Sequence, residues 1–114
     1  MKTSAQDPLH SYHWGNGGKA WELLKDASLS VKLETIEPGE GEQKHVHRQA
    51  QQYFFVLSGK ALIGLEAETI ALEKEEGLHI PPGVVHRIYN PFHDPVKFLV
   101  ISQPDTATDR INIK

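Results

Sequence analysis

The stretch Pro38–Gly59, PGEGEQKHVHRQAQQYFFVLSG, decides the fold. His45 and His47 lie one residue apart in it, and residues two apart on a β-strand point to the same side. The strand can therefore direct two imidazoles at one point, which is how a transition-metal site begins. A third histidine, His86, ends the later run PPGVVH, which lies in another short segment bounded by turn residues.

The chain around these histidines resembles the cupin family in two motifs. Gly39, His45, His47, Gln52 and Gly59 match the spacing of the first cupin motif, with one departure. The family usually has glutamate at the position that holds glutamine here. A lone His-X-His pair would be weak evidence, but the flanking glycines make this motif specific.

The second cupin motif is matched by Pro81, Gly83, His86 and Asn90. Its leading glycine is displaced, because the expected position holds Glu75 and the nearest glycine lies two residues later. Together the two motifs cover nearly half of the chain in the family's order. The resemblance implies an all-β double-stranded β-helix, or jelly-roll barrel.

By the same resemblance, His45, His47 and His86 are ligands of one divalent transition metal ion, and Gln52 lies where a fourth ligand would be. The donor types suit Fe, Mn, Zn, Ni or Cu equally. Two alternatives stay open. The histidines can be hydrogen-bonded core residues of a cupin that has lost its metal, and Gln52 can make a structural hydrogen bond instead of binding metal.

Length and composition predict a single domain, 1–114, with an N-terminal arm (1–18), a barrel (19–102) and a C-terminal tail (103–114). The net charge is −3 and no Lys/Arg cluster appears, which argues against nucleic-acid and anionic-membrane partners. No apolar run approaches the ~18–20 residues that span a bilayer. The chain has no cysteine and no apolar leader at residues 1–10, so we expect a cytoplasmic protein.

Alternation and turn residues predict about eight short strands and no helix, hence an all-β sandwich or barrel. Expected strands lie at 20–25, 29–36, 43–47, 52–57, 61–65, 68–72, 78–80, 85–89 and 96–102. In 29–36, Leu29, Val31 and Leu33 form an apolar side, which is typical of a half-buried strand. Because His45 and His47 are odd-numbered, an inward Gln52 requires an irregularity at residues 48–51.

Strand parity predicts an apolar pocket wall for a small organic molecule. Its members would be Phe54, Val56, Ile63, Leu78, Ile80, Ile88 and Phe98. The candidate catalytic residues near the metal are Gln52, Arg48 and Tyr53, with Tyr89 as a further polar group. Parity favours outward positions for both tyrosines.

Other polar and aromatic residues are expected outside the site. His79 should point away from the metal, because Leu78 and Ile80 take the inner face. Tyr12, Trp14 and Trp21 are expected to be packing or dimer anchors. Asp109-Arg110 in the tail is expected to be solvated, or else an intersubunit ion pair.

These residues favour a metal-dependent enzyme that acts on a small, chelating anion. Three neutral imidazoles and an amide leave a divalent site at about +2, which favours anionic ligands. The resemblance makes dioxygenase chemistry the first expectation, ahead of isomerase or lyase chemistry. The alternative is a non-catalytic cupin that senses or carries a small molecule or a metal. Family resemblance also suggests a homodimer.

Overall fold

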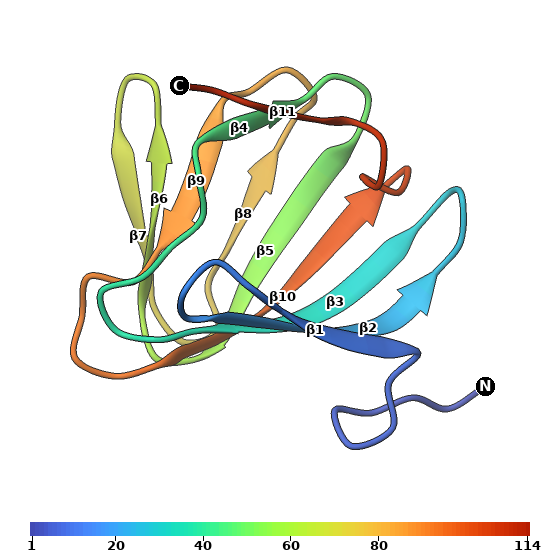
Figure 1. The fold of residues 1–114 in the computed structure, drawn as a ribbon. Coiled ribbons are helices and arrows are strands. Elements are labelled where there is room, and N and C mark those ends of the chain that lie inside the picture. The colour runs from blue at the N-terminus through green and yellow to red at the C-terminus, as the bar shows by residue number, and fades with distance from the viewer.

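The computed structural model describes residues 1–114, which form eleven strands and no helix (Figure 1). The strands are β1 (His10–Trp14), β2 (Gly18–Lys25), β3 (Ser30–Ile36), β4 (His45–His47), β5 (Gln51–Ser58), β6 (Ala61–Leu65), β7 (Thr69–Leu72), β8 (Gly77–Ile80), β9 (His86–Tyr89), β10 (Val96–Gln103) and β11 (Arg110–Asn112). No segment forms an apolar helix long enough to cross a bilayer. The predicted all-β class is confirmed.

Two antiparallel sheets face each other across one core. The six-stranded sheet has the order β1-β2-β3-β10-β5-β8, and the five-stranded sheet has the order β11-β4-β9-β6-β7. Figure 1 shows the C-terminal strand β11 lying against β4 at the edge of the five-stranded sheet. This is the predicted jelly-roll arrangement.

Alternating side chains of β5 and β10 build the core from the six-stranded sheet. Phe54 and Val56 alternate with more exposed neighbours on β5, and Val96, Phe98 and Val100 do so on β10. The full core cluster is Ile36, Phe54, Val56, Ala61, Ile63, Leu72, Ile80, Ile88, Val96, Phe98 and Val100. Burial of these side chains fills one end of the sandwich and is its main stabilising contribution.

Strand β3 turns its polar side inward, which the alternation did not predict. Lys32 pairs with Val100 and Glu34 pairs with Phe98 of β10, so these even-numbered residues share the inner face. The apolar side of β3 faces away from the cavity, where Leu33 pairs with Leu99 and is only 9% exposed. The alternation of side chains along β3 was therefore predicted correctly, but their polarity gave the wrong side as the inner one. A cavity, and not the apolar core, covers this part of the sheet.

The expected N-terminal arm contains a strand. β1 pairs with β2 along its whole length, with Tyr12 opposite Ala20 and Trp14 opposite Gly18. A Cβ on Gly18 would lie 2.2 Å from the Trp14 ring, so only glycine lets the indole pack this closely. Trp14 packs against the core cluster, in agreement with its expected packing role, and both Tyr12 and Trp14 also line the cavity described below.

The expected C-terminal tail is fastened to the strand that carries two of the histidines. β11 pairs with β4, and the backbone N–H of Ile113 donates to the Lys44 carbonyl at 2.9 Å. The Asp109 carboxylate accepts hydrogen bonds from the backbone N–H groups of residues 48–50 at 2.9–3.1 Å. These bonds hold the pKa of Asp109 below its ordinary value, against the opposing effect of desolvation. Asp109 is therefore a loop cap and not a freely solvated residue.

The departure from the second cupin motif has a backbone consequence. Glu75, at the position expected for glycine, has a φ of 64° and is the one non-glycine residue with positive φ. Left-handed backbone costs an L-residue about 1–2 kcal/mol, which glycine avoids. The turn therefore has a left-handed residue at this position, although glycine, which suits that backbone best, is absent.

Candidate metal centre and cavity

Three histidines from two neighbouring strands meet between the sheets. His45 and His47 lie on β4 and are both buried, and His86 begins β9, directly opposite His45. One ring nitrogen from each of the three lies within 4.8 Å of the others. Antiparallel pairing of β4 with β9 and the period of two on β4 together produce this convergence.

The three imidazoles are kept neutral by burial. Desolvation lowers the pKa of His45 to about 3 and that of His47 to about 4, and it lowers that of His86 as well. The Arg110 guanidinium acts in the same direction on all three. A neutral imidazole is the form that binds a metal ion.

Backbone carbonyls fix the ring orientation of two histidines. His45 Nδ1 lies 2.8 Å from the Gln43 carbonyl oxygen, and His86 Nδ1 lies 2.9 Å from that of Val84. Because a carbonyl only accepts, each Nδ1 carries the proton and each Nε2 presents a lone pair. Metal-binding histidines are commonly oriented in this way.

Gln52 completes the group from the opposite sheet. Its Oε1 lies 3.0 Å from His86 Nε2, and its Nε2 donates to Ser102 Oγ at 3.1 Å. An amide oxygen facing an imidazole lone pair is repulsive unless a cation binds both atoms or the amide is rotated and donates. Both roles predicted for Gln52, ligand and hydrogen-bonding group, agree with this position.

These features fit a divalent metal ion. His47 Nδ1 is buried and has no hydrogen-bond partner, so the ring of this histidine has unused hydrogen-bonding capacity within the protein. Together with two oriented Nε2 lone pairs and the Gln52 oxygen, the donor set is three nitrogens and one oxygen. Three histidines with a weak fourth donor are typical of open metal sites and not of closed structural ones.

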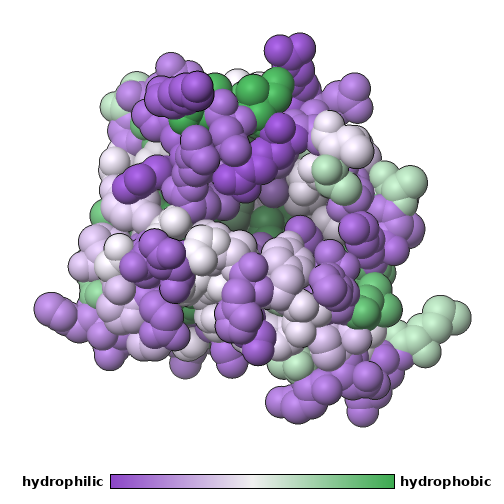
Figure 2. Space-filling model, in the orientation of Figure 1, coloured by the Kyte–Doolittle hydropathy of each residue, from purple (hydrophilic) through white to green (hydrophobic).

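A cavity of about 520 Å³ opens beside the histidines. Figure 2 shows the hollow in the middle of one face, bordered by hydrophilic residues, with apolar atoms visible at its bottom. Seven of its 20 lining residues are hydrophobic, so the wall is more polar than predicted. Of the seven predicted apolar residues only Phe54, Ile88 and Phe98 line it. The other four belong to the core or pack against it, namely Val56, Ile63, Ile80 and Leu78.

Glu42 and Arg110 flank the histidines, and sequence reasoning did not find either role. Glu42 Oε1 lies 3.9 Å from His45 Nε2, and Glu42 Oε2 lies 3.8 Å from Arg110 Nη1. Burial raises the pKa of Glu42 to about 8, and the charge of Glu34 adds to this. The sequence predicts Arg110 only as part of an Asp109-Arg110 pair that is solvated or else forms an intersubunit ion pair. No local signal marks Glu42, and β4–β11 pairing is what brings Arg110 to the cavity.

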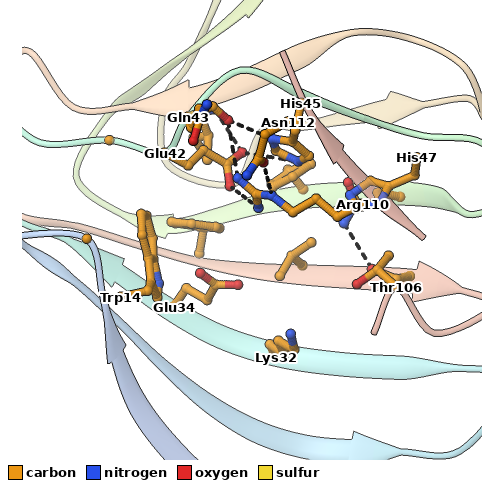
Figure 3. Close-up of a pocket in the computed structure, with 18 of the residues that line it drawn as sticks. Trp14, Lys32, Glu34, Glu42, Gln43, His45, His47, Thr106, Arg110 and Asn112 are labelled. Carbon is orange, nitrogen blue, oxygen red and sulfur yellow. Dashed lines mark hydrogen bonds and ion pairs between the residues drawn. The ribbon is translucent and has the colours of Figure 1, made fainter. Parts of the chain in front are cut away.

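The opposite wall of the cavity comes from β1 and β3. Figure 3 shows Trp14, Glu34 and Lys32 on one side, facing the histidines and Arg110 on the other. Burial raises the pKa of Glu34 to about 7, although Lys32 and the Trp14 N–H both oppose the shift. Lys32 Nζ donates to Tyr12 Oη at 3.0 Å.

Two of the candidate catalytic residues lie outside this cavity. Arg48 is exposed in the loop capped by Asp109, and Tyr53 is 40% exposed on the outer face of β5, beside Phe55. Tyr89 does not line the cavity either, and Arg87 stacks on its ring. His79 points outward, as expected, and bonds to Gln51. Of the three candidates, only Gln52 lines the cavity.

The comparisons with known proteins identify the family. Residues 32–102 match the cupin domain model, and the chain therefore belongs to the cupin family. It is 28% identical over 106 residues to the uncharacterized protein SCO3923 of Streptomyces coelicolor, covering 93% of this chain and 100% of that protein. Among solved structures, KdgF from Halomonas sp. superposes with a TM-score of 0.83 at 14% identity, covering 92% of this chain and 94% of that one.

A third relative contains the domain as a small part. Mannose-1-phosphate guanylyltransferase of Salmonella montevideo is 40% identical over 63 residues, which are 54% of this chain and 13% of that protein. The family match supports a small-molecule-binding cupin that can hold a metal ion on three histidines.

Proposed function

We propose that the protein is a metal-dependent enzyme that acts on a small, chelating anion. The observation that carries this proposal is the convergence of three neutral, buried imidazoles, two of which, those of His45 and His47, line a cavity of about 520 Å³. His45, His47 and His86 would hold a divalent ion, with Gln52 as a ligand or as a hydrogen-bonding group beside it. When bound, such an ion supplies Lewis acidity, and a redox-active one also supplies oxygen chemistry.

The residues around the histidines suit an anionic ligand. Arg110 places a permanent positive charge at the cavity, 39% exposed and so accessible to a ligand. Its guanidinium is held by Asn112 Oδ1 at 2.8 Å and by the Gln43 carbonyl at 3.3 Å. A carboxylate bound near the histidines would gain a second, charge-assisted contact from it.

Oxygenase chemistry remains the first reaction to test, and one observation favours isomerase or lyase chemistry as the second. Glu34 and Glu42 both line the cavity, and burial brings the pKa values of both toward neutral pH. Carboxyl groups of that acidity exchange protons readily with a bound substrate. Oxygen uptake by anaerobically iron-loaded protein would indicate the first class, and deuterium incorporation from D₂O without oxygen uptake the second.

The decisive experiment measures the metal content of tag-free protein by mass spectrometry. We expect a near-stoichiometric divalent metal in the wild type and its loss in His47→Ala. His79→Ala is the matched control, because His79 is exposed and lies outside the cavity. The assignment of the histidines as metal ligands would be wrong if the wild type stayed metal-free after loading. It would also be wrong if all three proteins had equal metal content.

The homodimer and the cytoplasmic location remain predictions. Sedimentation velocity tests the first, with twice the chain mass of 12.8 kDa expected.

A further inference from the structure

The cavity wall that faces the histidines has its own chemistry. It consists of Tyr12 and Trp14 on β1 and Lys32 and Glu34 on β3, and is called the β1/β3 wall below. All four are even-numbered residues that strand pairing places on the inner face. None of them is needed to hold a metal ion, so their polarity requires another explanation.

Trp14 brings an unpaired hydrogen-bond donor to this wall. Its Nε1 is buried and has no partner in the protein. The Trp14 N–H lies close enough to Glu34 to favour the charged form of its carboxylate. The N–H and the carboxylate nevertheless do not form a hydrogen bond of ordinary geometry. A buried donor without an acceptor destabilises the protein, so a ligand atom that accepts from it is favoured.

Lys32 adds a fixed positive charge beside Glu34. Its Nζ bonds to Tyr12 Oη at 3.0 Å and lies 5.6 Å from the centre of the Tyr12 ring. Burial lowers the pKa of Lys32, but the hydrogen bond to Tyr12 and the nearby carboxylates raise it by more, so the ammonium stays charged. An ammonium has three donors, and Tyr12 occupies one of them.

The β1/β3 wall thus offers donors and an acceptor side by side. A hydroxyl group both accepts and donates, so one ligand hydroxyl can accept from Trp14 Nε1 while it donates to Glu34. An apolar ligand would leave these groups unpaired, at a cost. A second anionic group is disfavoured, because the Glu34 carboxylate offsets the Lys32 charge. The wall therefore suits neutral hydroxyls better than a phosphate or a second carboxylate.

We propose that the β1/β3 wall is a hydroxyl-binding subsite and that the ligand class is a small polyhydroxy acid. Its chelating carboxylate end lies at the histidines and Arg110, and its remaining hydroxyls lie between Trp14, Glu34 and Lys32. This proposal rests on the metal-dependent function proposed above for the carboxylate end. Trp14 and Glu34 are then specificity-determining residues, which select the ligand by its hydroxyls.

Isothermal titration of the metal-loaded protein tests this subsite. Glycolate provides only the chelating end, and gluconate, galactonate, glucuronate and galacturonate add further hydroxyls. We expect at least one of these four acids to bind about tenfold more tightly than glycolate, which is the gain expected from one or two hydrogen bonds in a buried site. Trp14→Phe and Glu34→Gln should each remove most of that gain, taken within each variant as the ratio of the affinity for the polyhydroxy acid to the affinity for glycolate.

Matched controls lie outside the cavity. Trp21→Phe changes an indole on β2 and Glu66→Gln changes an exposed carboxyl at the β6–β7 turn, and neither should affect the gain. The subsite is overturned if no polyhydroxy acid binds more tightly than glycolate. It is also overturned if the gain survives in both Trp14→Phe and Glu34→Gln.

Failure of the metal proposal gives a different result. If the protein takes up no metal, or if glycolate does not bind, the proposed function falls while the subsite can still be judged. Saturation-transfer NMR on metal-free protein with the same acids then decides it. Saturation transfer to the protons on the hydroxyl-bearing carbons of the ligand supports the subsite if it is seen with the wild type and lost in Trp14→Phe. Absence of transfer with the wild type refutes the subsite.

Discussion

At the scale of single residues, Gln52 distinguishes this chain from the usual cupin motif. Its side chain occupies the expected place, buried between His86 and Ser102, but it carries no charge. A site with three imidazoles and this amide keeps the full charge of a divalent ion. That difference makes the residue a direct test of how charge at the fourth position sets metal affinity.

We expect Gln52→Glu to bind a divalent metal at least about tenfold more tightly than the wild type, because a carboxylate is a stronger, charged donor. Ser102 Oγ can donate to the carboxylate as well, so the local hydrogen bonding is preserved. Competition with a chelating indicator measures the affinity. Gln51→Glu is the control, since that neighbouring side chain bonds to Gln103 and His79 outside the cavity. An equal gain in metal affinity in both variants would mean that the added negative charge acts only at long range and not as a ligand.

Only those site residues that belong to a motif could be predicted from the sequence. His45, His47, His86 and Gln52 are fixed by motif spacing and strand parity, and the structure brings these four together as predicted. Arg48 and Tyr53 were chosen for polarity near the motif in sequence, and the structure places both outside the cavity. Glu34 and Lys32 were overlooked, because an alternating strand gives two faces and no indication of which one a cavity will cover.

At the scale of elements, the loop between β4 and β5 sets the distance between the histidines and Gln52. Residues 48–50 provide the irregularity that parity required, and the Asp109 carboxylate accepts their backbone N–H groups. The need for this corner was therefore predictable. The group that fixes it was not, because it lies about sixty residues later in the chain.

Asp109→Ala should lower the free energy of unfolding by about 1–2 kcal/mol, the range for loss of a charged backbone cap. It should also weaken metal binding, since His47 precedes and Gln52 follows the released loop. Urea unfolding and the indicator assay give the two numbers. Asp94→Ala, an exposed loop substitution, is the control. A loss no greater than that of the control would show that water replaces the carboxylate without cost.

At the scale of the whole molecule, the partly buried carboxyls of the cavity make stability depend on pH. Folding raises the pKa of Glu34 from its ordinary 4.5 to about 7, chiefly through burial. The folded state therefore binds this proton more tightly than the unfolded chain does. The resulting stabilisation is complete below about pH 4.5 and is lost as the pH rises to about 7.

In metal-free protein, Glu34→Gln should remove this part of the pH dependence. The variant should gain stability relative to the wild type as the pH rises from 4.5 to 7, and the difference should level off above that. Urea unfolding at a series of pH values measures it. Glu66→Gln, at an exposed position, should run parallel to the wild type. A Glu34→Gln curve that also runs parallel would place this carboxyl in full contact with solvent.

The four residues of the candidate metal centre belong to both sheets. The histidines lie on β4 and β9 of the five-stranded sheet, and Gln52 lies on β5 of the six-stranded one. An ion bound by all four would join the two halves of the sandwich, and any ligand that prefers the folded state shifts the folding equilibrium by mass action. In a cell, proteases remove chains mainly from the unfolded fraction. The abundance of this protein would then follow the free concentration of its metal, and scarcity of that metal would shorten its lifetime.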